Sequence, residues 1–201
     1  MSYTAIVLFG NDGQARDDEI TFENSWRGAM AVWRYMEQTY LGPYIPYDED
    51  KDLTPEEYER KHGYVPSRLA MLDEQALESL WRTVDNPDIP FNDRVCMATT
   101  LDWVIVEKPD FPKVIEAFRA FSVPSSLPEQ AEEIEKLMED NTVSAIGWMQ
   151  NSIVDNLWLS YCDDTSTVPS IDEDPDGGRK PYNYKDGTKH WFLFDEIKKG
   201  E

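Results

Sequence analysis

Positive charge is scarce in this sequence, and its scarcity excludes several classes of partner. The 201 residues include 19 Lys and Arg against 40 Asp and Glu, which gives a formal net charge of −21 at pH 7. Such a chain repels the phosphates of nucleic acids and of anionic membranes, so we expect neither as a direct partner. The charge favours a basic protein partner, with solubility alone as the simpler explanation.

Cysteine and histidine are also scarce, with two residues of each type. Cys96 and Cys162 lack the spacing of metal ligands, and neither His62 nor His190 lies beside a cysteine in the sequence. We therefore expect free thiols in a reducing compartment, with no metal and no cofactor. Nucleophile-elbow, P-loop, dinucleotide-binding and zinc-protease motifs are missing as well, which favours a protein that is not an enzyme.

Long apolar runs are missing too. No segment reaches the roughly 18 consecutive apolar residues of a membrane-spanning helix. The apolar stretch at residues 3–9 is too short for a signal peptide and has no basic start. These features predict a cytoplasmic protein.

The patterns that are present predict an α+β fold. The apolar fraction of 40% and the aromatic fraction of 12% are typical of a globular chain. Strands are predicted near residues 3–9, 103–107, 143–148 and 190–195, and the last of these reads equally as a short helix. The turn sequence at 10–13 predicts a hairpin with a further strand near 19–22. Without regular strand–helix alternation, we expect a small mixed or antiparallel sheet packed with about five helices.

Two helix starts carry capping sequences. Thr54 is followed by Pro55 and, three residues on, by Glu57, and Ser126 is followed at the same distance by Glu129. In a capping box the hydroxyl accepts from a free backbone amide while the glutamate accepts from the amide of the capping residue. Both helices are therefore predicted to begin at these positions.

The central stretch Arg94–Phe121 organises the predicted fold. It reads as an extended apolar segment, with 95–99 either a strand or a helical turn, followed by an amphipathic helix. Its four bases equal its four acids, so the net charge of the chain lies elsewhere. We expect this stretch to pack inside. The predicted organisation is a single α+β domain over 1–160, an acidic irregular loop over 161–189, and a segment at 190–201 that docks back.

The acids gather in three segments, which we take as candidate partner-binding residues. The first segment holds Asp48, Glu49, Asp50, Asp52, Glu56, Glu57 and Glu59; the second holds Glu129, Glu132, Glu133, Glu139 and Asp140; the third holds Asp163, Asp164, Asp172, Glu173, Asp174 and Asp176. Nearby aromatic residues are candidate anchors for a partner, because aromatic side chains dominate binding hot spots. They are Tyr44, Tyr47, Tyr58 and Trp158.

Part of the third segment resembles the start of a calcium-binding loop. Asp172, Asp174 and Asp176 stand at positions 1, 3 and 5, and Gly177 stands at position 6. Position 12 is Asn183 instead of the glutamate that completes such a loop. An ordinary acidic loop is therefore the favoured interpretation.

The charge density favours a mimic of nucleic acid. Duplex DNA carries one charge per about 1.7 Å, so a charge of −21 equals that of about 36 Å of duplex. A folded chain of this length is about 40 Å across. The leading hypothesis is a non-enzymatic acidic inhibitor of a basic nucleic-acid-binding protein, such as a nuclease, a restriction enzyme or a CRISPR effector. That would make it an anti-defence protein (anti-CRISPR or anti-restriction) of a phage or mobile element.

Two alternatives remain open. One is an immunity protein or antitoxin that neutralises a basic toxin by the same electrostatics. The other is a small-ligand-binding or enzymatic module with a polar pocket. The residues that would line this pocket are Thr99, Thr100, Asp102, Gln150 and Asn151.

Overall fold

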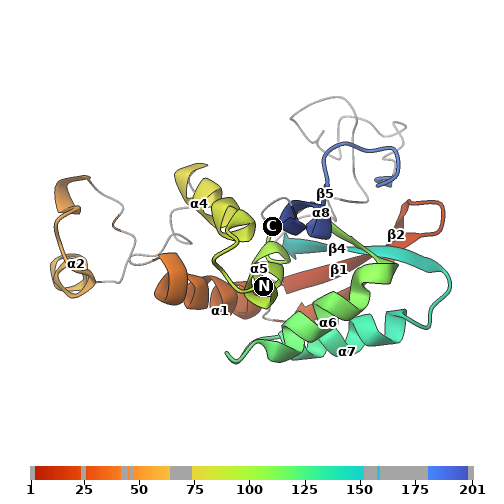
Figure 1. Cartoon of the computed structure of the whole chain (residues 1–201), viewed down its shortest axis with the longest axis horizontal. Coiled ribbons are helices and arrows are strands. Elements are labelled where there is room, and N and C mark those ends of the chain that lie inside the picture. The colour runs from red at the N-terminus through yellow and green to blue at the C-terminus, as the bar shows by residue number, and fades with distance from the viewer. Residues whose placement is uncertain are drawn as a thin grey trace, which may run out of the picture.

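A computed structural model of the chain describes residues 3–23, 26–41, 45, 48–63, 74–151, 158 and 181–198. These residues form a five-stranded mixed sheet and seven α-helices, which confirms the predicted α+β class (Figure 1). The strands are β1 (Tyr3–Gly10), β2 (Ala15–Glu23), β3 (Val104–Glu107), β4 (Val143–Asn151) and β5 (Trp191–Phe192). The helices are α1 (Trp26–Met36), α2 (Pro55–His62), α4 (Glu74–Asp85), α5 (Phe91–Ala98), α6 (Phe111–Ala120), α7 (Leu127–Leu137) and α8 (Leu193–Lys198).

The sheet has the strand order β2-β1-β4-β3-β5. Neighbouring strands are antiparallel except for β3 and β5, which are parallel. The predicted hairpin is present, and its second strand begins at Ala15, four residues earlier than expected. Gly13 has a φ of 87° in the connecting turn, a conformation that suits glycine because it has no Cβ.

Strand alternation divides the buried residues into two clusters, one on each face of the sheet. Ile6 and Leu8 of β1 point into the larger cluster, which also holds the buried faces of α1, α5, α6, α7 and α8. The intervening Val7 and Phe9 point into the smaller cluster, which is rich in aromatic side chains. Figure 1 shows α6 and α7 lying side by side along the sheet.

In the first part of the central stretch, the helical alternative is confirmed and the extended one is wrong. Residues 95–98 belong to α5, Thr99 is its C-terminal cap, and the residues from Arg94 to Ala98 are all buried. Because this part of the helix is buried on every side, it shows no polar face and therefore no helical periodicity in the sequence. Even Arg94 is inside, where its guanidinium donates to the carbonyl oxygens of Val84 and Ile197 at 2.6 and 2.7 Å.

Residues 190–195, predicted as a strand or a short helix, contain both: the strand β5 and the start of the helix α8. β5 pairs with β3, and α8 follows it directly, with Leu193, Phe194 and Ile197 buried in the larger cluster. No helix among the described residues is both long enough and apolar enough to cross a membrane.

Candidate protein-interaction surface

The helix α7 presents carboxylates on the side that faces away from the sheet. Its buried positions recur at helical spacing, so that one stripe of the helix packs on the core. They are Leu127, Gln130, Ala131, Ile134 and Leu137. Glu129 and Glu132 are exposed, and within the described part of the chain neither forms an ion pair. Their negative charge is therefore available to a partner.

Two other carboxylates of α7 are paired with bases. Lys136 donates to Glu133 at 2.6 Å, and Arg119 of α6 donates to Glu135 at 2.7 Å. Like charges on one helix face cost a few tenths of a kcal/mol per pair. These two bases offset part of that repulsion, so α7 can hold its carboxylates close together.

A buried hydrogen bond fixes α7 to the sheet. Trp148 of β4 is fully buried, and its Nε1 donates to Gln130 Oε1 at 3.0 Å. Gln130 Nε2 in turn donates to the Ser126 hydroxyl at 3.1 Å. The predicted capping box of Ser126 and Glu129 is wrong, because the Ser126 hydroxyl accepts from this side chain instead of a backbone amide.

The turn that follows α7 brings more acids beside the edge strand β2. Arg16 donates to the two carboxylate oxygens of Asp18 at 2.7 and 2.6 Å and to the Thr142 hydroxyl at 2.8 Å. Thr142 donates its hydroxyl and its backbone amide to Asp140, and these bonds lower the pKa of Asp140 below its usual range. Figure 1 shows this turn at the same end of the sheet as the β1–β2 turn.

These groups together form what we call the α7–β2 acidic surface. It consists of Asp18, Glu129, Glu132, Glu133, Glu139 and Asp140. Five of the six belong to the second acidic segment predicted from the sequence. Asp18 was missed, although three consecutive acids at 17–19 within a predicted hairpin were a visible signal.

The first acidic segment has a different character, because part of it is structural. Asp50 is buried and accepts hydrogen bonds from Lys61 and His62, so its prediction as a partner-binding acid is wrong. Glu57 closes the predicted capping box of α2 by accepting from the Thr54 amide at 2.8 Å, which lowers the pKa of Glu57.

Besides Glu57, which is exposed, four acids of the first segment lie on the surface. They are Glu49, Asp52, Glu56 and Glu59. The side chain of Asp48 lies outside the described residues. Figure 1 shows α2 at the opposite end of the molecule from the β1–β2 turn. The first and second acidic segments therefore do not form one continuous surface.

The two predicted aromatic anchors among the described residues are buried. Tyr58 is fully buried and its ring packs against His62. Trp158 is buried in the smaller cluster, with Phe9 and Trp103 at centroid distances of 5.3 and 4.5 Å. Both predictions are wrong, because these side chains fill the interior.

Several predicted site residues lie outside the described residues. They are Tyr44, Tyr47, Asp163, Asp164, Asp172, Glu173, Asp174 and Asp176. The calcium-loop resemblance at 172–177 falls there too, and so does the acidic loop predicted over 161–189 for all but its last residues.

The polar residues of the alternative ligand site do come together. Asp102 Oδ1 accepts from the Gln150 amide at 3.0 Å, and Gln150 Nε2 donates to the Thr99 carbonyl at 3.5 Å. Asp102 is exposed as a residue, although the groups packed around its carboxylate raise its pKa. Thr100 accepts a hydrogen bond from the buried Trp33.

This polar cluster lines neither of two cavities that described residues border. One cavity, of about 720 Å³, runs beside α1, and the other, of about 100 Å³, lies between β3 and α8. Nor does the described part of the chain bring together three His, Cys, Asp or Glu side chains in a way that could hold a metal ion.

Comparisons with known proteins give no further guide to function: no protein-family model, no curated protein and no solved structure matches this chain.

Proposed function

We propose that this protein is a non-enzymatic inhibitor that docks its α7–β2 acidic surface onto a basic, nucleic-acid-binding protein. The observation that carries the proposal is a row of exposed carboxylates on a helix that a buried hydrogen bond fixes to the sheet. A fixed row of charges loses little conformational freedom when it binds, which favours association.

The spacing of these charges supports mimicry of a nucleic-acid strand. Six acids occur between Glu129 and Asp140, and at about 1.5 Å per helical residue they span about 16 Å. This is one carboxylate per about 3 Å, and one net charge per about 5 Å once the paired bases Lys136, Arg119 and Arg16 are counted. The phosphates of one DNA strand are about 3.4 Å apart along the axis.

The same exposed carboxylates are expected to speed the association with a basic partner. Exposed carboxylates attract a basic surface over about 10 Å at 0.1 M salt, and this attraction raises association rates more than it lowers dissociation rates. We therefore expect inhibition that falls steeply as the salt concentration rises, as it does for the nucleic acid that is displaced.

The test is competition with DNA for a panel of basic proteins. The panel contains a sequence-specific restriction endonuclease, a CRISPR effector complex and a basic nonspecific nuclease, each bound to fluorescent DNA at 50 and 200 mM salt. The proposal predicts displacement of DNA from at least one of them at low salt, weakened at high salt. If the DNA complexes of all three persist at low salt, the proposal is wrong.

A pair of charge-matched variants localises the surface. Glu129→Gln, Glu132→Gln and Glu139→Gln together remove three exposed carboxylates from the α7–β2 acidic surface. Asp52→Asn, Glu56→Gln and Glu59→Gln remove the same charge from α2 and the turn that precedes it. We expect the first triple variant to inhibit at least tenfold more weakly and the second to inhibit normally. Equal weakening would show that net charge acts without a defined surface.

A further inference from the structure

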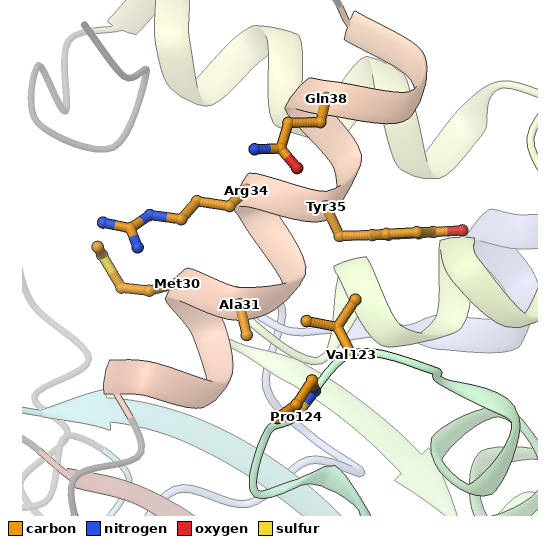
Figure 2. Close-up of a pocket in the computed structure, with 7 residues that line it drawn as sticks. All are labelled: Met30, Ala31, Arg34, Tyr35, Gln38, Val123 and Pro124. Atoms are coloured by element: carbon orange, nitrogen blue, oxygen red, sulfur yellow. The ribbon is translucent and has the colours of Figure 1, made fainter. Parts of the chain in front are cut away.

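A groove runs along α1 on a part of the surface that the proposed function does not use. Its volume of about 720 Å³ lies within the range of about 300–1,000 Å³ that is typical of small-molecule sites. The described residues that line it are Met30, Ala31, Arg34, Tyr35, Gln38, Val123 and Pro124 (Figure 2).

Helical spacing builds one wall of the groove. Met30 and Arg34 of α1 and Gln38 of the π-helical turn Glu37–Leu41 that continues it follow one another at intervals of four residues, and Figure 2 shows them projecting to the same side. Ala31 points toward Val123 and Pro124, which form the other wall. The small alanine side chain leaves the space between the helix and residues 123–124 open.

The aromatic part of the lining is held in place before any ligand binds. The Tyr35 hydroxyl donates to Asp93 Oδ2 at 3.0 Å, and the Tyr40 hydroxyl donates to the same oxygen. The Tyr35 ring also meets Phe121 edge to face at a centroid distance of 5.3 Å. A preformed apolar wall binds a ligand without the entropy cost of ordering itself.

Arg34 places an unpaired guanidinium at this groove, and among the described residues the exposed Arg60 of α2 is also without an ion pair. Its side chain is exposed, and among the described residues no carboxylate pairs with it, although the chain contains 40 acids. Arg16, Arg82 and Arg119 each bind a carboxylate at 2.7 Å or less. A guanidinium binds carboxylates through parallel hydrogen bonds, and here that capacity is unused.

We propose that the groove binds a small organic carboxylate with an apolar body. The carboxylate accepts hydrogen bonds from Arg34 and from the Gln38 amide at the rim, and the apolar body lies along Met30, Ala31 and Val123. This site is independent of the proposed inhibitor function, because it attracts an anion instead of a basic protein.

The experiment uses octanoate as the probe, with octanol as the neutral control of the same chain length. The intact protein is labelled with ¹³C at its methionine methyl groups and observed by NMR. Octanoate, below its micelle concentration, is expected to shift the Met30 signal in a saturable way and to bind at least fivefold more tightly than octanol. Met36, Met97 and Met149 are buried, and their unchanged signals report that each variant stays folded.

Two arginine variants test the role of the cation. Arg34→Gln is expected to weaken octanoate binding roughly tenfold, the loss of one charge-assisted contact. Arg82→Gln removes the same charge from α4, away from the groove, and is expected to bind octanoate normally.

The proposal is overturned if octanol binds as well as octanoate, if both variants lose affinity equally, or if the exposed Met138 shifts in place of Met30. The DNA competition assay remains unaffected by any of these results, so the two proposals fail separately.

Discussion

The hydrogen bond between Trp148 and Gln130 offers a direct test of how the acidic helix is held. Replacing Gln130 with leucine keeps a side chain of similar size but removes the acceptor of the Trp148 Nε1 hydrogen bond. Both residues are almost fully buried, at 0% and 3% exposure, so water cannot replace the lost acceptor. A buried donor left without an acceptor costs about 1–3 kcal/mol.

That cost translates into a measurable change in thermal stability. For a domain of this size, a loss of 1 kcal/mol lowers Tm by about 2–4 °C. We therefore expect Gln130→Leu to lower Tm by roughly 2–12 °C. Glu129→Gln, one residue earlier on the exposed side of α7, serves as the control and is expected to change stability by no more than about 0.5 kcal/mol.

A double-mutant cycle isolates the hydrogen bond from other effects. Trp148→Phe removes the indole N–H, so Gln130→Leu in that background leaves no donor unpaired. The cost of Gln130→Leu should therefore be smaller by about 1–3 kcal/mol when phenylalanine occupies position 148. Calorimetry or urea unfolding followed by circular dichroism gives the four values. Additive effects of the two substitutions would refute this account of how α7 is fixed.

Two further predictions concern buried groups. Hydrogen bonds from Lys61 and His62 lower the pKa of Asp50 in the folded protein. The contribution of Asp50 to the free energy of unfolding is therefore complete above pH 3.8, its usual pKa, and is lost as the pH falls through the lower pKa of the folded state. An NMR titration of its carboxyl carbon with a midpoint at or above 3.8 would contradict this prediction. Burial raises the pKa of Cys96, and its sulfur donates to the Ala117 carbonyl. In a Cys162→Ser variant we expect a thiol reagent to label Cys96 only as fast as the protein unfolds. Rapid labelling of the native protein would show that Cys96 is accessible and would contradict this prediction.

The fold was predictable where local patterns agree with tertiary packing. The apolar run at 3–9 and the capping box of Thr54 are both present as expected, because each depends on neighbours in sequence. The helix α5 could not be read in the same way. Its residues 94–98 are buried on every side, so the amphipathic signal that identifies a surface helix is missing.

The candidate site was harder to predict, because exposure depends on partners distant in sequence. In the sequence, Asp50 cannot be told apart from the other acids of the first segment. In the structure, Lys61 and His62 at the end of α2 form hydrogen bonds with it. Trp158 looks like an interface anchor until Phe9 and Trp103 surround it. Conversely, Asp18 joins the acidic surface only because the hairpin places β2 beside the turn after α7.

The acids of α2 and α7 differ in where they lie relative to the helix dipole. α2 carries Glu56 and Glu57 in its first turn and three bases in its last, an arrangement that the helix dipole favours and that stabilises the helix itself. α7 instead continues into Glu139 beyond its C-terminal end, where the dipole disfavours negative charge. Because local stability accounts for Glu56 and Glu57 of α2 and not for Glu139, a binding role is the stronger explanation for Glu139. For this reason the proposed interaction surface is centred on α7, even though the first segment contains more acids than the second.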